Sequence, residues 1–245
     1  MDTPIYWSLT EISSEWAEKS LQEIPSFFSP LELEKLAGLL VPKRRTEWLH
    51  GRRIAKQLLC NCFPLLAGND PTKISVLNAP SGAPYFADAN GMALPLALSL
   101  SHRAGWAACA ITDHPDLSLG IDLECIEPRA DSFVDTFFTD DEIAFTGSLN
   151  GKQRDLWITL VWSLKEAVLK ALGQGLRLDT RAVQVQPPAT FAPAEAGWQP
   201  VGVTCAQSAP SHWSAWFMRR DDLLITLAIR GNREKSDLSI LQSIM

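Results

Sequence analysis

The spacing of apolar and polar residues changes along this chain and predicts a mixture of helices and strands. Apolar residues three and four positions apart predict helices at about 13–23, 30–40, 43–62, 140–147 and 154–172. Alternating or short apolar runs predict strands at 5–9, 73–78, 95–101, 105–112, 117–124, 198–205, 213–218 and 223–230. Short connections separate the strands between 95 and 124, so we expect them to form an antiparallel meander.

The helix at 154–172 carries charged residues on one stripe and apolar residues on the opposite face. At 100° per residue, the polar stripe contains Asp155, Thr159, Trp162, Glu166 and Lys170. A Glu followed by a Lys four residues later is also a common surface pair that stabilises a helix by only tenths of a kcal/mol. The helix alone therefore does not separate a functional pair from a structural one.

Two carboxylates follow each other on one face of the strand at 117–124. In Gly120-Ile121-Asp122-Leu123-Glu124, the period of two puts Asp122 and Glu124 on the same side. Such a pair is most often part of a solvated strand face. Because like charges repel at this spacing, a bound divalent cation is the alternative, and Mg²⁺ commonly takes one or two protein carboxylates.

The helix at 43–62 concentrates positive charge in a chain whose formal net charge is -6. Arg45, Arg52 and Lys56 are seven and four residues apart and share one face. A solvated basic face is the ordinary interpretation of such a helix. In an acidic chain, this face is also a candidate anion site.

The two halves of the chain show the same order of elements, a charged helix followed by about three strands. We therefore expect an α+β fold of two similar lobes, related by a pseudo-twofold axis, each with an antiparallel sheet packed on a long helix. The active site would lie in the cleft between the lobes. The expected boundaries are 1–116 for the N-terminal lobe, 117–231 for the C-terminal lobe and 232–245 for a polar tail.

Composition restricts the class of protein. With 245 residues, 20% charged and 46% hydrophobic, the chain can bury a sizeable core, and its acidic balance argues against general nucleic-acid binding. No apolar run approaches the length of a bilayer span, and the start lacks the basic region of a signal peptide, so we expect a cytoplasmic protein without a membrane partner. The five cysteines lack zinc-site spacing and are expected to be free thiols.

Three blocks of residues, in this order, resemble the 4′-phosphopantetheinyl transferase superfamily in its larger, surfactin-synthetase-activating (Sfp) type. They are Leu98-Ser99-Leu100-Ser101-His102, Gly120-Ile121-Asp122-Leu123-Glu124, and Trp162-Ser163-Leu164-Lys165-Glu166-Ala167 with Lys170 and Gly173-Gln174-Gly175-Leu176. Phe137-Phe138 and Glu142 are also placed as in the family. The resemblance runs from about residue 28 to residue 180.

The resemblance implies an enzyme that transfers the 4′-phosphopantetheine arm of coenzyme A to a serine of an apo acyl or peptidyl carrier protein. The reaction would need Mg²⁺ and release 3′,5′-ADP. Asp122, Glu124 and Glu166 would be the metal ligands, and Glu166 and Lys170 the catalytic pair, with Glu166 as general base. A non-catalytic module that binds coenzyme A or a carrier protein is the alternative.

The same resemblance implies which residues contact coenzyme A. These would be Arg45, Arg52, Ser101, His102, Lys165 and Lys170. The family often has a basic residue where this chain has Ala83, in Gly82-Ala83-Pro84, so a phosphate contact there would be lost or supplied by another group. A monomer is expected, since the shorter branch of the family assembles its sites between subunits.

Overall fold

The computed structural model describes residues 4–12, 24–68, 70–188, 197–206, 212–231 and 241–243. The chain divides into a first unit, Met1–Pro115 with Ser239–Met245, and a second unit, Asp116–Leu238. The structure does not determine how the two units are placed relative to each other, so the predicted cleft and twofold axis stay predictions. None of the described helices is both long enough and apolar enough to span a membrane.

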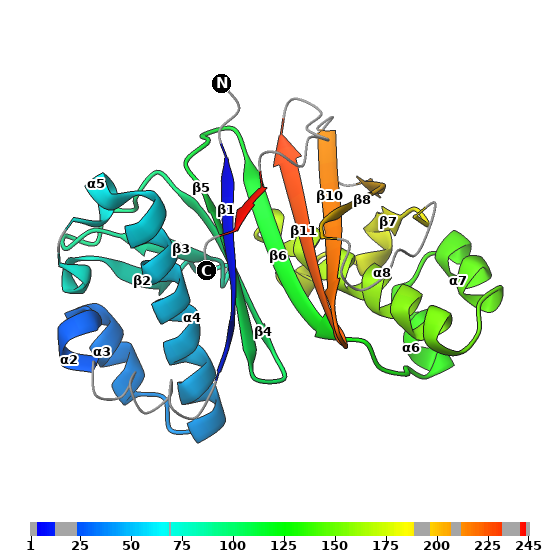
Figure 1. Ribbon diagram of the computed structural model, residues 1–245, viewed down its shortest axis with the longest axis horizontal. Coiled ribbons are helices and arrows are strands. Elements are labelled where there is room, and N and C mark those ends of the chain that lie inside the picture. The colour runs from blue at the N-terminus through cyan, green and yellow to red at the C-terminus, as the bar shows by residue number, and fades with distance from the viewer. Residues whose placement is uncertain are drawn as a thin grey trace. The chain divides into compact units, whose positions relative to one another are not determined.

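The first unit packs one long helix on a sheet that holds two distant parts of the chain (Figure 1). Its helices are α2 (Ile24–Phe27), α3 (Pro30–Ala37), α4 (Pro42–Cys62) and α5 (Pro64–Ala67), and its strands are β1 (Ile5–Glu11), β2 (Ser75–Asn78), β3 (Pro84–Ala87), β4 (Ala97–Arg103), β5 (Trp106–Thr112) and β12 (Leu241–Ser243). The sheet runs in the order β12-β1-β5-β4, and β2 and β3 form a separate hairpin. Helix α4 covers β5, β1 and β4.

The second unit also packs a long helix on a four-stranded sheet (Figure 1). Its helices are α6 (Asp131–Phe137), α7 (Asp140–Gly147) and α8 (Gly151–Ala171), and its strands are β6 (Ser118–Cys125), β7 (Val183–Val185), β8 (Gln199–Val201), β9 (Val203–Cys205), β10 (His212–Arg220) and β11 (Leu223–Gly231). The sheet runs in the order β6-β11-β10-β8, and every pairing in it is antiparallel. The α+β class with a long helix on each main sheet is therefore confirmed, and the pairings are antiparallel except that of β1 with β12.

Helix α8 lies unusually close to strand β6 because of one glycine. A Cβ added to Gly120 would stand 1.9 Å from the backbone oxygen of Ala167 and 2.8 Å from the backbone nitrogen of Ala171. Only a residue without a side chain allows this approach. The close packing brings the C-terminal half of α8 against the strand that carries Asp122 and Glu124.

Each unit contains the same buried cluster, built from a helix cap and a lysine. In the first unit, Ser29 and Glu32 form a capping box at the start of α3. Glu32 Oε2 also lies 2.5 Å from Lys56 Nζ, and its Oε1 accepts a hydrogen bond from the backbone N–H of Val76. Lys56, on α4, also donates to the carbonyl oxygens of Phe27 and Pro71.

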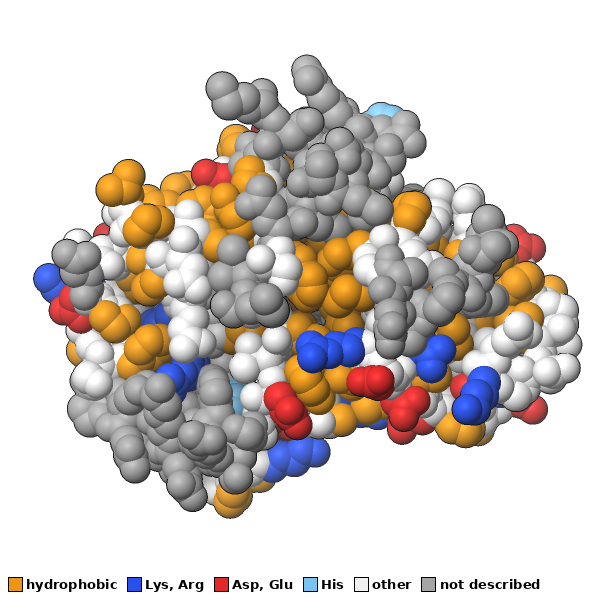
Figure 2. Space-filling model, in the orientation of Figure 1, with side chains coloured by type: hydrophobic (Ala, Val, Ile, Leu, Met, Phe, Trp, Pro, Cys, Tyr) orange, Lys and Arg blue, Asp and Glu red, His pale blue; other side chains and the backbone are white. Residues whose placement is uncertain are grey.

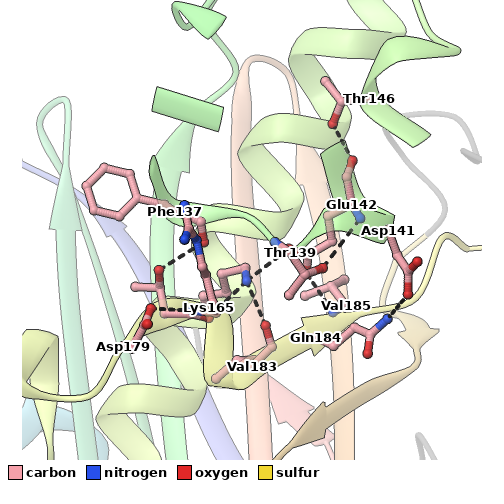
Figure 3. Close-up of polar contacts among 12 residues, drawn as sticks. Phe137, Thr139, Asp141, Glu142, Thr146, Lys165, Asp179, Val183, Gln184 and Val185 are labelled. Carbon is pink, nitrogen blue, oxygen red and sulfur yellow. Dashed lines mark hydrogen bonds and ion pairs between the residues drawn. The ribbon is translucent and has the colours of Figure 1, made fainter. Parts of the chain in front are cut away.

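The second unit has the same contacts at equivalent places (Figure 3). Thr139 and Glu142 form the capping box of α7, and Glu142 Oε2 lies 2.9 Å from Lys165 Nζ. Glu142 Oε1 accepts from the backbone N–H of Val185 at 2.8 Å. The two clusters are formed by similar short segments, Phe27-Phe28-Ser29 with Glu32 and Phe137-Phe138-Thr139 with Glu142.

Two expectations from the sequence are wrong, and one falls outside the described residues. Strand β6 pairs with β11 rather than with β5, so the meander ends after β4 and β5. The tail assigned to 232–245 contains β12, which pairs in parallel with β1 and makes that sheet mixed. The helix expected at 13–23 lies outside the described residues.

On the face drawn in Figure 2, the described acidic and basic side chains are interspersed rather than separated by sign.

Candidate active site

Lys170 and Ser163 on α8 both contact the Asp122 carboxylate on β6. Asp122 is 5% exposed, its Oδ1 lies 2.8 Å from Lys170 Nζ, and its Oδ2 accepts a hydrogen bond from Ser163 Oγ at 2.8 Å. Ser163 Oγ is also 2.8 Å from Thr226 Oγ1 on β11. Lys170 donates its other hydrogen bond to the carbonyl oxygen of Ile121 at 3.1 Å. The carboxylate of Asp122 is therefore both neutralised and fixed in orientation.

Glu124, two residues along the same strand face, has a different set of partners. Its Oε1 accepts from Trp162 Nε1 at 3.1 Å, and its Oε2 accepts from an Arg129 guanidinium nitrogen at 3.1 Å. The Arg129 guanidinium also lies 4.8 Å from the ring centroid of Phe133. Aromatic packing and an ion pair thus hold Glu124 at the end of β6 next to α8.

Glu166 is the least satisfied carboxylate of the group. Its Oε1 is buried and has no hydrogen-bond partner among the described residues. Burial raises the pKa of Glu166, the negative charges of Asp122 and Glu124 raise it further, and the positive charge of Lys170 opposes them. The three carboxylates therefore act on one another electrostatically, as the shared strand face and helix stripe predict.

Asp122, Glu124 and Glu166 offer carboxylate oxygens, the ligand type that a hard divalent cation takes. Within the described residues, no three His, Cys, Asp or Glu side chains stand close enough together to hold a metal ion. Asp122 and Glu124 are instead neutralised by Lys170 and Arg129. A carboxylate oxygen that is buried without a partner, beside two further carboxylates, is nevertheless the environment that a cation with oxygen ligands relieves.

Comparison with known proteins locates this site in a family. The family model for the 4′-phosphopantetheinyl transferase superfamily matches residues 118–228, which include all four residues Asp122, Glu124, Glu166 and Lys170. Over this segment, the chain is similar to the 4′-phosphopantetheinyl transferase superfamily. The larger Sfp type of this superfamily is the type that its relatives indicate.

Three relatives match different shares of this chain. It is 29% identical over 170 residues to the 4′-phosphopantetheinyl transferase HetI of Nostoc sp., a match that spans 69% of each chain. It is 28% identical over 138 residues to a 4′-phosphopantetheinyl transferase of Bacillus subtilis, which covers 56% of this chain and 58% of the relative. It is 24% identical over 171 residues to Sfp of Bacillus subtilis strain 168, which covers 69% of this chain and 71% of the relative.

Lys165 does not contact the site, although the resemblance implies a coenzyme A ligand there. Its side chain is fully buried, and Nζ donates to Glu142, to the carbonyl oxygen of Thr180 at 2.9 Å and to the carbonyl oxygen of Val183 at 2.6 Å (Figure 3). These contacts use its three N–H donors. Burial lowers the pKa of Lys165, and the charge of Glu142 opposes this effect. The prediction of a cofactor-binding Lys165 is therefore wrong.

The basic face of α4 is divided by the fold rather than presented as one surface. Lys56 is buried against Glu32, which removes it from the candidate anion site. Arg45 is partly exposed and donates to the carbonyl oxygen of Leu36 at 2.9 Å. Arg52 is 8% exposed, donates to Asn78 and stacks on Trp48, with the guanidinium carbon 4.4 Å from the ring centroid. Arg52 also lines a pocket of the first unit, and its predicted contact with coenzyme A stays a prediction.

Ser101 and His102 lie at the end of β4, in the first unit, where the chain turns toward β5. His102 is exposed, and Ser101 is partly exposed. The turn itself contains Ala104 and Gly105, both with positive φ. The predicted contact of Ser101 and His102 with coenzyme A stays a prediction.

Three groups at the acidic site were missed by sequence reasoning. Ser163 and Thr226 orient Asp122, and Arg129 pairs with Glu124. Ser163 lies inside the Trp162–Ala167 block, three residues and so about one helical turn before Glu166, which was a usable signal. Nothing in the local sequence around Arg129 or Thr226 indicates their contacts.

Proposed function

We propose that this chain transfers the 4′-phosphopantetheine arm of coenzyme A to a serine hydroxyl of an apo acyl or peptidyl carrier protein, with Mg²⁺, and releases 3′,5′-ADP. The observation that supports it most is the position of Glu166, whose unpartnered buried oxygen lies in the field of Asp122 and Glu124. The similarity to the transferase superfamily agrees with this chemistry.

Asp122, Glu124 and Glu166 would hold the magnesium ion. Bound there, Mg²⁺ would neutralise negative charge on the pyrophosphate of coenzyme A and on the developing transition state. The paired cations Lys170 and Arg129 are next to the same carboxylates and can supply positive charge to phosphate oxygens when these carboxylates change partners.

The serine hydroxyl is a weak nucleophile, so its proton must leave as the new bond forms. The serine oxygen bonds to the phosphorus that carries pantetheine, the bridging phosphorus–oxygen bond breaks, and 3′,5′-ADP departs. We assign the proton to Glu166, because its raised pKa makes this carboxylate a better base near neutral pH than an ordinary glutamate. Lys170, one helical turn away, would stabilise the charge on the phosphate being transferred.

In the first unit, Arg45, Ser101 and His102 are the proposed partners of the coenzyme A phosphates. An arginine suits this role because its guanidinium can pair with two phosphate oxygens at once. We further expect the enzyme to act as a monomer in the cytoplasm, in a pathway that uses carrier proteins for fatty acids, polyketides or nonribosomal peptides.

The test is a mass measurement on the acceptor. The purified protein, coenzyme A and Mg²⁺ should add about 340 Da to an apo carrier protein, the mass of the transferred group. Fatty-acid, polyketide and peptide carriers should be assayed side by side, with a chelator and the Asp122→Ala variant as controls. No adduct on any carrier would overturn the proposal, and coenzyme A binding without turnover would support the non-catalytic alternative.

A further inference from the structure

Arg129, which follows β6 in the second unit, neutralises Glu124, one of the proposed metal ligands. Its terminal nitrogen Nη2 lies 3.1 Å from Glu124 Oε2. The two side chains are 16% and 14% exposed, so this ion pair is only partly open to solvent. The guanidinium also covers the ring of Phe133 on α6. A positively charged group of the protein itself therefore occupies Glu124.

The negative charges of the acidic site are largely balanced by the protein. Lys170 pairs with Asp122. Arg129 likewise pairs with Glu124, so two of the three carboxylates have a cation beside them. A divalent cation that binds these oxygens meets two positive charges at close range, and like charges repel strongly in a partly buried site. Its affinity therefore depends on whether one of the two protein cations can move away.

Arg129 can move away, because a second carboxylate lies within its reach. Glu127 Oε1 is 3.9 Å from the same Nη2 atom, and the Glu127 side chain is 46% exposed. The Nε atom of Arg129 is buried and has no acceptor among the described residues. In a guanidinium, Nε–H and one N–H of Nη2 point to the same side, so a carboxylate on that edge accepts from both. A closer approach of Glu127 along this edge would give Nε the acceptor that Glu124 does not provide.

Glu124 keeps its orientation without Arg129, because its other oxygen has an uncharged donor. Trp162 Nε1 donates to Glu124 Oε1 at 3.1 Å. The Trp162 ring packs edge-on against Phe133, with 5.0 Å between the ring centroids. An indole carries no net charge and repels a metal ion far less than a guanidinium does. Glu124 can therefore exchange Arg129 for a metal ion while its contact with Trp162 stays in place.

We infer that Arg129 is a positioning residue that sets the affinity of the acidic site for its divalent cation. It pairs with Glu124 while the metal is absent and passes to Glu127 when the cation takes Glu124. This inference rests on the proposed metal-dependent transfer, and it adds a residue that contacts neither the substrate nor the metal. An arginine at this position makes metal binding weaker than the three carboxylates alone would allow.

Mn²⁺ is a suitable probe, because it takes the same oxygen ligands as Mg²⁺ and its free concentration can be measured by electron paramagnetic resonance. The full chain is first treated with a chelator and dialysed. Arg129→Met, which keeps an apolar stem against Phe133, should bind Mn²⁺ at least about fivefold more tightly than the parent. Arg129→Gln, which also removes the charge, serves as a second variant if Arg129→Met does not fold.

Two results would overturn the inference at this stage. Unchanged or weaker Mn²⁺ binding in the variant is the first, because removing an arginine that only holds Glu124 in place would lower the affinity. The second is the absence of measurable binding by parent and variant alike at about 10 mM Mn²⁺. Tighter binding supports a cation that competes with the metal.

The exchange of partners is tested by a double-mutant cycle. Glu127→Gln should weaken Mn²⁺ binding about threefold or more in the parent, and less than about 1.5-fold in the Arg129→Met background. The difference is expected because Glu127 stabilises the metal-bound state through Arg129. An equal loss in both backgrounds would mean that Glu127 acts only by its charge at a distance, and would overturn the exchange.

Two controls assign the gain in affinity to this contact. Glu124→Gln, combined with Arg129→Met, should remove the gain, and a gain that survives would overturn the inference. Arg181→Gln removes one positive charge from an exposed position of the same unit, where the side chain donates to the carbonyl oxygen of Asp135. It should leave Mn²⁺ binding unchanged, and an equal gain there would indicate a general charge effect and overturn the inference.

The carrier-loading assay separates this inference from the proposed function. Mn²⁺ binding is measured without coenzyme A and without a carrier protein. Failure of the parent to load any carrier would therefore overturn the proposed function and leave the metal measurements standing. Carrier loading by the parent, together with unchanged Mn²⁺ affinity in Arg129→Met, would keep the function and overturn the role of Arg129.

Discussion

Lys165 Nζ lies 2.9 Å from Glu142 Oε2, with 0% and 1% of the two side chains exposed. This ion pair joins α8 to the start of α7, and Lys165 is the immediate neighbour of Glu166. An ammonium group enclosed in this way fixes the rotation of α8 about its axis. The direction in which Glu166 points is therefore set by a contact inside the unit.

Replacing Lys165 by methionine should destabilise the protein by about 3–5 kcal/mol, because the carboxylate of Glu142 would remain buried without its cation. Urea unfolding measures the change, and Lys152→Met, at an exposed position of the same helix, should stay within about 0.5 kcal/mol of the parent. Where the Lys165→Met variant is folded, its KM for coenzyme A should change little. A large rise in KM without loss of stability would contradict the structural role.

Glu166→Gln should stabilise the metal-free protein and abolish turnover. Because the folded state raises the pKa of Glu166 above the ordinary 4.5, the folded chain binds more protons than the unfolded chain between the two pKa values, and ionised Glu166 disfavours the fold at higher pH. In a chelator at pH 7, the Tm of the variant should exceed that of the parent, and the difference should shrink as the pH falls toward 4.5.

Turnover of Glu166→Gln should fall by about 100-fold or more, since both the base and a metal ligand are changed. Glu11→Gln, an exposed carboxylate of the first unit, is the control for both measurements. A near-parental rate at saturating Mg²⁺ would show that Glu166 is not the base.

His50 should make the first unit sensitive to mild acid. Burial, together with the charge of Arg53, lowers the pKa of His50 from 6.5 to about 4. The unfolded chain therefore binds more protons between these values, so stability falls as the pH drops from 6.5 to about 4, by on the order of 3 kcal/mol. His50→Gln should flatten this part of the stability curve, whereas His212→Gln, at an exposed position, should not.

Gly120→Ala should disrupt the acidic site by separating α8 from β6. The new Cβ would lie 1.9 Å from the Ala167 carbonyl oxygen, so α8 must move away from β6. We expect a loss of about 3 kcal/mol or more in stability and a fall in turnover. Gly147→Ala, where nothing lies within 4 Å of the added atom, should be neutral or stabilising. Parental activity in Gly120→Ala would show that the close approach is not needed.

The sequence predicts most elements well, because in each of them the spacing of apolar residues matches the side chains that are buried. The helix expected at 43–62 is α4 (Pro42–Cys62), and the strand expected at 117–124 is β6 (Ser118–Cys125). Strand partners are less predictable, because alternation shows which face is buried but not which strand lies alongside. The short connection after β5 favours a hairpin, yet β6 finds its partner about 100 residues later, in β11.

Some side chains of the site could likewise be predicted from the sequence, and others could not. Asp122, Glu124, Glu166 and Lys170 follow from period and spacing, and the structure brings Glu166 and Lys170 close to Asp122. Lys165 and Lys56 could not be placed, because helices covered on several sides bury charges that a helical wheel assigns to solvent. The repeated Phe-Phe-Ser/Thr segment with a glutamate three residues later was the available signal for both.

The place of β12 makes the first unit depend on chain that follows the second. Without Leu241–Ser243, one edge of β1 would have no partner among the described strands, and an unpaired edge invites association with other chains. During synthesis, the second unit leaves the ribosome before this edge can be covered. The second unit can therefore fold before the sheet of the first unit is complete, although the first unit is synthesised earlier.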